Sequence, residues 1–181
     1  MLELDHRIFY ALYGGPSHAS AAAFVMIALT VMGSGWSMLG LVPLLVVART
    51  RRVALALTGT LAVTAALVFL GKAAIGRPRP CAALSGVHAI FGAPTDFSLP
   101  SGHAAGAFAF AAFVATVILS RSRSVRALAA AGALLALAAG VALSRVYLGC
   151  HFPADALAGA VLGGTLGIFG GNAYARRAPT A

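Results

Sequence analysis

Long apolar segments, separated by short stretches of charged, glycine and proline residues, occupy most of this chain. Residues 53–71, for example, contain no charged side chain and are followed directly by Lys72. A helix needs about 20 apolar residues to cross the hydrocarbon core of a bilayer. Because 60% of the residues are hydrophobic and 9% are charged, the composition indicates a polytopic membrane protein rather than a water-soluble domain.

Turn residues and charges divide the chain into six predicted membrane-spanning helices. They cover residues 17–33, 36–48, 53–71, 101–120, 125–145 and 152–174. The second is short for a bilayer, so it must stand upright, thin the bilayer around it or extend its end side chains to the interface. Residues 1–15 hold a short amphipathic helix expected to lie in the membrane interface, residues 73–99 form one long polar loop, and residues 175–181 form a tail. The predicted fold is an all-α membrane bundle, a single domain over residues 1–181.

The basic residues predict how this bundle is oriented. Six crossings would place both termini on one side of the membrane, together with most of the lysine and arginine residues. Because Lys and Arg favour the cytoplasmic side, we expect both termini there. On the opposite face the sequence leaves four cations that break this rule and therefore need another role: Lys72, Arg77, Arg79 and Arg145.

The net charge of +9 would suggest nucleic-acid binding in a soluble protein. Here the arginines cluster at the ends of apolar segments, where they set topology and meet anionic headgroups. Aromatic residues are not interleaved with them, so the predicted partners are the lipid bilayer and a membrane lipid substrate rather than nucleic acid. The sequence carries no signal for an oligomeric state.

Three short motifs bring reactive side chains to the same predicted face. They are Lys72-x6-Arg79-Pro80, Pro100-Ser101-Gly102-His103 and Ser144-Arg145-x5-His151-x3-Asp155. If the last helix begins near His151, then His151 and Asp155 share one side of it. Asp155 can then hold one imidazole nitrogen and leave the other free as a nucleophile or base. Taken alone, a His-Asp pair that only satisfies two polar groups at the interface explains this spacing equally well.

Taken together, the three motifs closely resemble the signature of the type 2 phosphatidic acid phosphatase (lipid phosphate phosphatase) superfamily, which also includes vanadium haloperoxidases. Each motif position is present at the expected spacing, and the resemblance covers residues 17–174. It implies that His151 is a nucleophile that forms a phosphohistidine, and that Asp155 orients it. It also implies that His103 protonates the departing lipid oxygen and then activates the water that releases phosphate.

The residue chemistry supports phosphate binding independently of this resemblance. A phosphate ester carries negative charge that Lys72, Arg79 and Arg145 can neutralise. Ser101 and Gly102 open a helix, whose free N–H groups and dipole form an anion site. These five residues are the predicted phosphate-binding set.

No metal and no other cofactor is predicted. The expected outer face holds two carboxylates, Asp96 and Asp155, whereas hard cations need several oxygen ligands. Two histidines could bind zinc, but three nearby cations would oppose it. The loop residues His88 and Asp96 are interpreted as solvated, and Arg77 as either a headgroup contact or part of an exposed turn.

Cys81 and Cys150 each adjoin one of the motifs on the expected outer face. Outside the cytoplasm a disulfide between them would be permitted, and it would tie the phosphate-binding segment to the nucleophile segment. Two small, apolar free thiols are the alternative.

The sequence therefore predicts a metal-independent phosphatase in a bacterial inner membrane, with its site facing outward. Its substrate would be a lipid phosphate or diphosphate such as polyprenyl diphosphate, phosphatidylglycerol phosphate or phosphatidic acid. Two alternatives stay open: a phospho- or headgroup transferase of the same superfamily, and a protein that binds or transports an anionic lipid without chemistry. A binder has no need of two titratable histidines at one phosphate site, which favours an enzyme.

Overall fold

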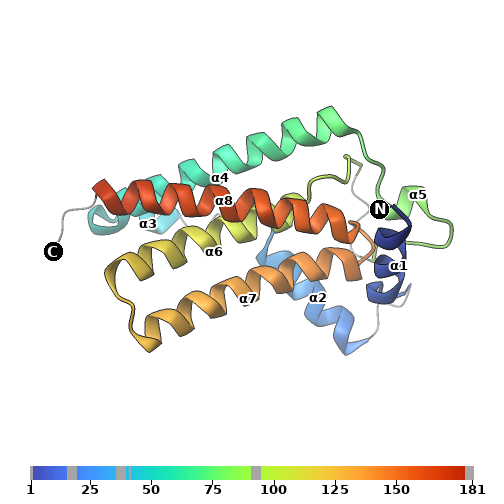
Figure 1. The fold of residues 1–181 in the computed structure, drawn as a ribbon, viewed down its shortest axis with the longest axis horizontal. Coiled ribbons are helices and arrows are strands. Elements are labelled where there is room, and N and C mark those ends of the chain that lie inside the picture. The colour runs from blue at the N-terminus through green and yellow to red at the C-terminus, as the bar shows by residue number, and fades with distance from the viewer. Residues whose placement is uncertain (1, 16–19, 36–39, 41, 91–94, 178–181) are drawn as a thin grey trace.

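The computed structural model describes residues 2–15, 20–35, 40, 42–90 and 95–177, which contain helices but no β-strand. The helices are α1 (Leu2–Leu12), α2 (Ala21–Met32), α3 (Val42–Val46), α4 (Ala48–Ile75), α5 (Pro80–Ala83), α6 (Gly102–Arg121), α7 (Val125–Tyr147) and α8 (Pro153–Arg177). Four of them, α4, α6, α7 and α8, lie side by side along the length of the molecule (Figure 1). Each of these four is long and apolar enough to cross a membrane. The predicted helical, multi-pass membrane fold is therefore confirmed, but not its six crossings.

The predicted second spanning helix, residues 36–48, is wrong. Of that range, the described residues form only the five-residue α3 and the first position of α4, which begins at Ala48. Gly33 ends α2 as expected, with its N–H donating to the Leu29 carbonyl oxygen. However, α2 begins toward the end of the bundle where α1 lies, and α3 lies at the opposite end (Figure 1). The described helices therefore do not show the expected return of the chain after α2.

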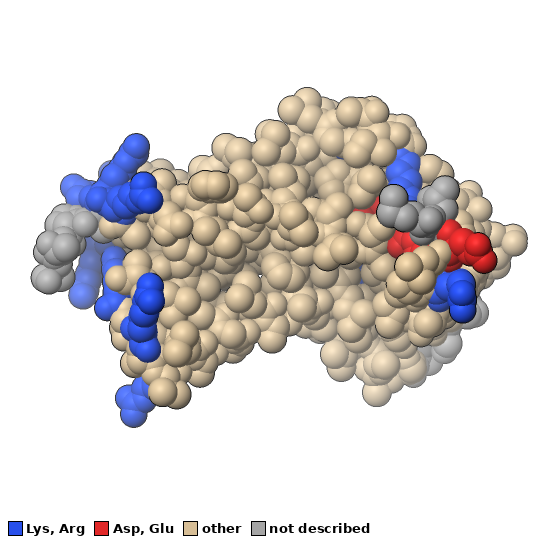
Figure 2. All heavy atoms as spheres, viewed as in Figure 1, with Lys and Arg blue, Asp and Glu red and all other residues tan. Residues whose placement is uncertain are grey.

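Helix α1 and the C-terminal end of α8 lie at opposite ends of the bundle (Figure 1), which differs from the expectation that both termini share one side. Helix α1 packs where α4 stops and where α6 and α8 begin. At the other end α4 and α7 begin and α6 and α8 stop, and Arg side chains gather there without acidic neighbours (Figure 2). The residues of that basic end are Arg49, Arg51, Arg52, Arg121, Arg123, Arg126, Arg176 and Arg177.

The tightest helix contact joins α6 to α8. A row of buried glycines, four residues apart, faces α6: Gly159, Gly163, Gly167 and Gly171. A Cβ atom on Gly163 would lie 1.9 Å from the carbonyl oxygen of Ala105, so the two backbones touch there. Small residues permit this approach in membranes, where apolar lipid removes the hydrophobic drive for helix association. The contact sets the first turns of both helices side by side, and the Ser101 N–H donates to the Asp155 carbonyl oxygen at 3.0 Å.

Local sequence signals place the helix ends that surround the site. Ser101 is the N-cap of α6, and its side chain accepts from the Ala104 N–H at 3.5 Å. Pro153 begins α8, where its missing N–H leaves no helical hydrogen bond unmade. Helix α4 runs four residues past its predicted end, to Ile75, and Gly76 stops it in the left-handed conformation with a φ of 63°. The segment that follows Gly76 is thereby turned toward the first turns of α6 and α8.

Candidate active site

His151 lies between α7 and α8 and is almost fully buried. Nη1 of Arg79 is 3.0 Å from its Nε2. Because a guanidinium only donates hydrogen bonds, Nε2 must accept and must carry the lone pair. On the other side of the ring, Ser98 Oγ donates to Asp155 Oδ2 at 2.5 Å, so its 3.3 Å contact with His151 Nδ1 requires Nδ1 to be the donor. Both contacts select the tautomer in which Nε2 is unprotonated.

The surroundings also keep the imidazole neutral. Burial lowers the pKa of His151 to about 4. The hydrogen bond with Asp155 raises this pKa only in part, and the positive charges of Arg79 and Arg145 lower it further. At neutral pH, His151 therefore holds an available lone pair on Nε2 beside a cluster of cations, which is the form that a nitrogen nucleophile requires.

Asp155 lies directly behind His151, with its Oδ2 3.7 Å from Nδ1. Besides Ser98, it accepts from the Phe152 N–H at 2.9 Å on Oδ2 and from Arg77 Nη1 at 2.6 Å on Oδ1. Asp155 is fully buried, so these donors replace the water that its carboxylate loses. The structure thus brings together the predicted His-Asp pair, although α8 begins two residues after His151.

Asp96, a loop residue, joins two of the predicted phosphate-binding cations. Its Oδ2 forms an ion pair with Lys72 Nζ, and its Oδ1 accepts from Arg79 Nη2 at 2.5 Å. Arg79 also donates to the Asp96 carbonyl oxygen at 2.8 Å and to the Cys150 carbonyl oxygen at 2.8 Å. Burial alone would raise the pKa of Asp96, but the hydrogen bonds from Lys72 and Arg79 outweigh it and lower this pKa to about 2. A carboxylate therefore stays charged between two cations of the site.

Arg145, near the end of α7, is the third predicted cation and is 3% exposed. Its Nη1 donates to Thr30 Oγ1 on α2 at 3.3 Å, and Thr30 shares a 2.8 Å hydrogen bond with Ser144 Oγ. Within the described part of the chain, its Nε is a buried donor without a hydrogen-bond partner. Leaving such a donor unpaired costs free energy, so this position is suited to an acceptor that arrives with a ligand.

A cavity of about 350 Å³ lies among these groups. Its polar lining consists of Thr64, Lys72, Arg79, Asp96, His103, Arg145 and His151. Apolar residues of α4, including Leu61 and Val68, and Gly102 and Gly106 of α6 complete it. The cavity thus presents three cations and two imidazoles to whatever occupies it.

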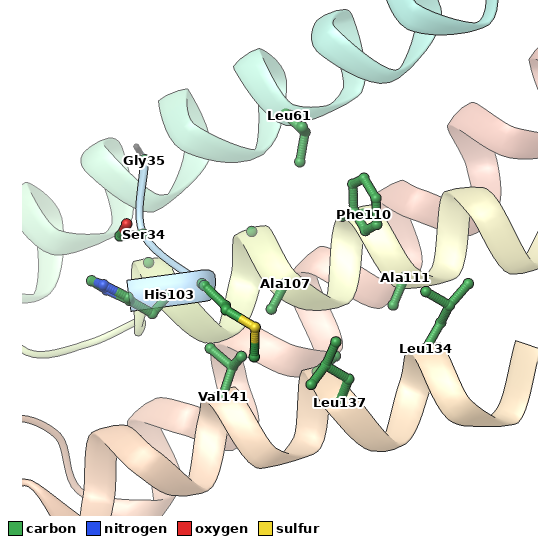
Figure 3. A pocket seen from close by; sticks show the side chains of 15 residues that line it. Ser34, Gly35, Leu61, His103, Ala107, Phe110, Ala111, Leu134, Leu137 and Val141 are labelled. Carbon is green, nitrogen blue, oxygen red and sulfur yellow. The ribbon is translucent and has the colours of Figure 1, made fainter. Parts of the chain in front are cut away.

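A second cavity, of about 360 Å³, continues from the first along α6. The two cavities share Leu61, Gly102, His103 and Gly106. Figure 3 shows His103 at one end of this second cavity, with Phe110 and Leu134 toward the other end. Apart from His103 and Ser34, its lining side chains are apolar, so it is suited to a hydrocarbon chain.

The predicted site residues take three kinds of position. Six of them line the cationic cavity: Lys72, Arg79, Gly102, His103, Arg145 and His151. Asp155 lies behind His151 rather than at the cavity. Ser101 is fully buried, and its side chain caps α6, so what it offers at the site is the start of that helix.

Three positions at the site were missed or misinterpreted from the sequence. Ser98 had no motif to mark it, although it is fully buried between His151 and Asp155. Asp96 was expected to be solvated, and it is half-exposed but paired with two cations. Arg77 is neither a headgroup contact nor part of an exposed turn, because it bridges Asp155 to Asp5 of α1. The mismatch with the positive-inside rule was the one sequence signal that pointed to Arg77.

The disulfide considered for Cys81 and Cys150 is not formed, because both thiols are free. Cys150 is buried in an apolar cluster with Ile90 and Leu148, and its Sγ contacts the Leu148 carbonyl oxygen at 3.6 Å. Burial raises the pKa of this thiol. Its carbonyl oxygen contributes to the site instead, by accepting from Arg79.

Among the residues that the structure describes, no three His, Cys, Asp or Glu side chains are placed to hold one metal ion together. The side chains around the cationic cavity are mostly hydrogen-bond donors. They are therefore better suited to the oxygens of an anion than to a cation.

Comparison with known proteins shows the family of this chain. The sequence matches the PAP2 superfamily over residues 52–178. A curated relative, undecaprenyl-diphosphatase of Sulfolobus acidocaldarius, is 31% identical over 120 residues, which are 66% of this chain and 54% of that protein. The chain thus spans about half the length of this relative.

Two solved structures share the fold. Aquifex aeolicus LpxE superimposes with a TM-score of 0.71 at 27% identity, covering 92% of this chain and 94% of that one. The first transmembrane PAP2 type phosphatidylglycerolphosphate phosphatase from Bacillus subtilis gives a TM-score of 0.78 at 23% identity, covering 97% of this chain and 86% of that one. The chain belongs to the PAP2 superfamily, as its three motifs predicted.

Proposed function

We propose that this chain is a membrane phosphatase that hydrolyses a lipid phosphate or diphosphate through a phosphohistidine on His151. The observation that carries the proposal is the cationic cavity, in which Lys72, Arg79 and Arg145 surround the histidine. The lone pair on Nε2 supports His151 as the nucleophile. The unpartnered Nε of Arg145 supports an anionic substrate, because a phosphate oxygen would satisfy that buried donor.

The proposed reaction has two steps, each with a defined proton transfer. In the first, Nε2 of His151 attacks phosphorus, the bond from phosphorus to the lipid-side oxygen breaks, and His103 gives that oxygen a proton. Arg79 must turn from Nε2 toward the phosphoryl oxygens for this attack. In the second, His103 takes a proton from water, whose oxygen attacks phosphorus and breaks the N–P bond. The cations stabilise the transferring phosphoryl group, and Asp155 stabilises the charged imidazole.

The apolar cavity supports a lipid as the leaving group. His103, the proposed acid, lines both cavities, so a substrate with its phosphate at His151 can extend its hydrocarbon chain along α6. Burying apolar surface there contributes roughly 25 cal/mol per Å². The names of two relatives, an undecaprenyl-diphosphatase and a phosphatidylglycerolphosphate phosphatase, make these lipids the first substrates to try.

Charge distribution supports an orientation with the site outside the cytoplasm. The arginine-rich end, opposite the site, is the one that the positive-inside rule assigns to the cytoplasm. In a bacterial inner membrane, the cationic cavity and α1 would then face outward, and the end of α8 would lie inside. This keeps the predicted side for the site and reverses it for the N-terminus.

The function is tested by phosphate release from the purified full-length chain in detergent or vesicles. Undecaprenyl diphosphate, phosphatidylglycerol phosphate and phosphatidic acid should each be assayed with a metal chelator present, beside tail-less glycerol 3-phosphate. We expect release from at least one lipid with the chelator present, inhibition by vanadate, and a much lower kcat/KM for glycerol 3-phosphate. No release from any lipid would overturn the proposal, and phosphate transfer to an added alcohol instead of water would indicate a transferase.

Replacing Asp96 by asparagine should strengthen anion binding. The Asp96 carboxylate occupies donors of Lys72 and Arg79 that a phosphate also needs, so the two anions compete. Since ion pairs at half-exposed positions are worth up to about 1 kcal/mol, Asp96→Asn should lower the vanadate inhibition constant about two- to fivefold. Inhibition curves at fixed ionic strength measure this.

Glu3→Gln is the matched control for Asp96→Asn, since it removes a carboxylate from an exposed position on α1. Its vanadate inhibition constant should equal that of the unmodified chain. Weaker vanadate inhibition in Asp96→Asn would contradict competition and would mean that Asp96 helps to hold the cations in place.

A further inference from the structure

Two charged residues, Asp5 and Arg77, link helix α1 to the carboxylate of Asp155. Asp5 Oδ2 accepts from Arg77 Nη2 at 2.6 Å, and Arg77 Nη1 donates to Asp155 Oδ1 at 2.6 Å. The second oxygen of Asp5 accepts from the Ala154 N–H at 2.9 Å, in the first turn of α8. Asp5 is 8% exposed, so a carboxylate has been buried at this contact. Burial of a charge is costly unless it is fully paired, as it is here.

Aromatic contacts hold α1 in the same place. The face of α1 that carries Asp5 also carries Phe9, which is fully buried with its ring centroid 5.5 Å from that of Phe152. His6 stacks on Phe152 at 5.1 Å, and the Arg77 guanidinium lies 4.2 Å from the centre of the same ring. Phe152 directly follows His151, so α1 is packed against the residue next to the proposed nucleophile.

We infer that α1 supports the catalytic centre from outside, with Asp5 and Arg77 acting as positioning residues for Asp155. A planar guanidinium held at both ends by carboxylates cannot rotate, so it fixes Asp155 Oδ1. Asp155, held also by Ser98 and Phe152, in turn fixes the ring of His151. Neither Asp5 nor Arg77 lines the cationic cavity. Helix α1 also lies outside residues 52–178, the part of the chain that matches the PAP2 superfamily.

This inference rests on the proposed function, and its test uses the full-length chain with whichever lipid in the substrate panel releases phosphate. Asp5→Asn keeps the shape of the side chain but weakens its hold on Arg77. We expect kcat to fall on the order of tenfold, as for other groups that orient a catalytic residue, with KM within about twofold of the unmodified chain. Arg77→Gln should lower kcat by at least as much.

The two substitutions should not be additive, because both act through one chain of contacts. The double variant should therefore have the kcat of Arg77→Gln, rather than about tenfold less. Arg77→Lys keeps the charge but not the planar fork, so it should recover only part of the loss. Glu3→Gln, on the same helix, should have the kcat of the unmodified chain.

Vanadate inhibition separates positioning from general damage. Among the described residues, no hydrogen bond or ion pair joins Asp5 or Arg77 to Lys72, Arg79 or Arg145. The vanadate inhibition constant of Asp5→Asn should therefore be unchanged while its kcat falls. Unmodified kcat in Asp5→Asn, additive losses in the double variant, or equal losses of kcat and vanadate affinity would each overturn the inference. Failure of the unmodified chain to release phosphate would instead overturn the proposed function.

Discussion

A His151→Ala variant is expected to lose phosphate release by a factor on the order of 10⁴ or more. The substitution removes the Nε2 atom that would form the bond to phosphorus. A water molecule in the vacated space would lack the base and the orientation that Ser98 and Asp155 give to the imidazole. The cations would still bind the lipid, so KM and vanadate inhibition should change much less than kcat.

Trapping of the covalent intermediate tests the same prediction more directly. With lipid labelled in its phosphate, rapid quenching in alkali should leave label on the unmodified chain and none on His151→Ala. His88→Ala is the matched control, since His88 lies in an exposed loop at the same end of the molecule. Normal turnover in His151→Ala would rule out the phosphohistidine mechanism.

An Arg145→Gln variant is expected to lose about 10²- to 10³-fold in kcat, the range seen when one donor to a developing oxyanion is removed. The Arg145 guanidinium is buried beside the cavity and has an unsatisfied Nε. Such a donor stabilises the charge that develops on the phosphoryl oxygens strongly, because little water competes with the donor for those oxygens. Glutamine keeps a polar group there but lacks the positive charge and the paired N–H donors of the planar guanidinium.

Thermal unfolding distinguishes this role from a structural one. A buried charge without a carboxylate partner costs stability, so Arg145→Gln should unfold at the same temperature as the unmodified chain or a higher one. Arg126→Gln, at the other end of α7, controls for charge removal and should keep full activity. A large drop in unfolding temperature, with activity lost in proportion, would contradict a catalytic role for Arg145.

The sequence predicted much of the site because its motifs encode local geometry. Ser101 and Gly102 mark a helix start wherever that helix packs. The four-residue spacing of His151 and Asp155 keeps these two residues close, although α8 begins between them at Pro153. Long-range pairs carry no such signal. Ser98 lies 57 residues from Asp155, and Arg77 lies 72 residues from Asp5. No spacing rule connects positions so far apart.

The prediction of six crossings was wrong for a related reason. Gly33 ends a helix, and residues 36–48 are apolar, so local signals favoured a turn and a second span. A glycine at the end of a helix does not specify whether the chain returns. Arg49, Arg51 and Arg52, which follow residues 36–48, lie in the first turns of α4. That error moved the N-terminal helix to the wrong end of the bundle and hid the role of Asp5.

By itself, the sequence determined that the chain is a helical membrane protein, and its motifs predicted the PAP2 superfamily and a candidate set of phosphate-binding residues. Hydropathy and short spacings suffice for this, because each acts within one or two turns of a helix. The tertiary structure alone decided that α1 packs against α8 and that Arg77 joins Asp5 to Asp155. Those contacts depend on how α6 and α8 pack through the glycine row, since that packing sets where distant charged groups can neutralise one another.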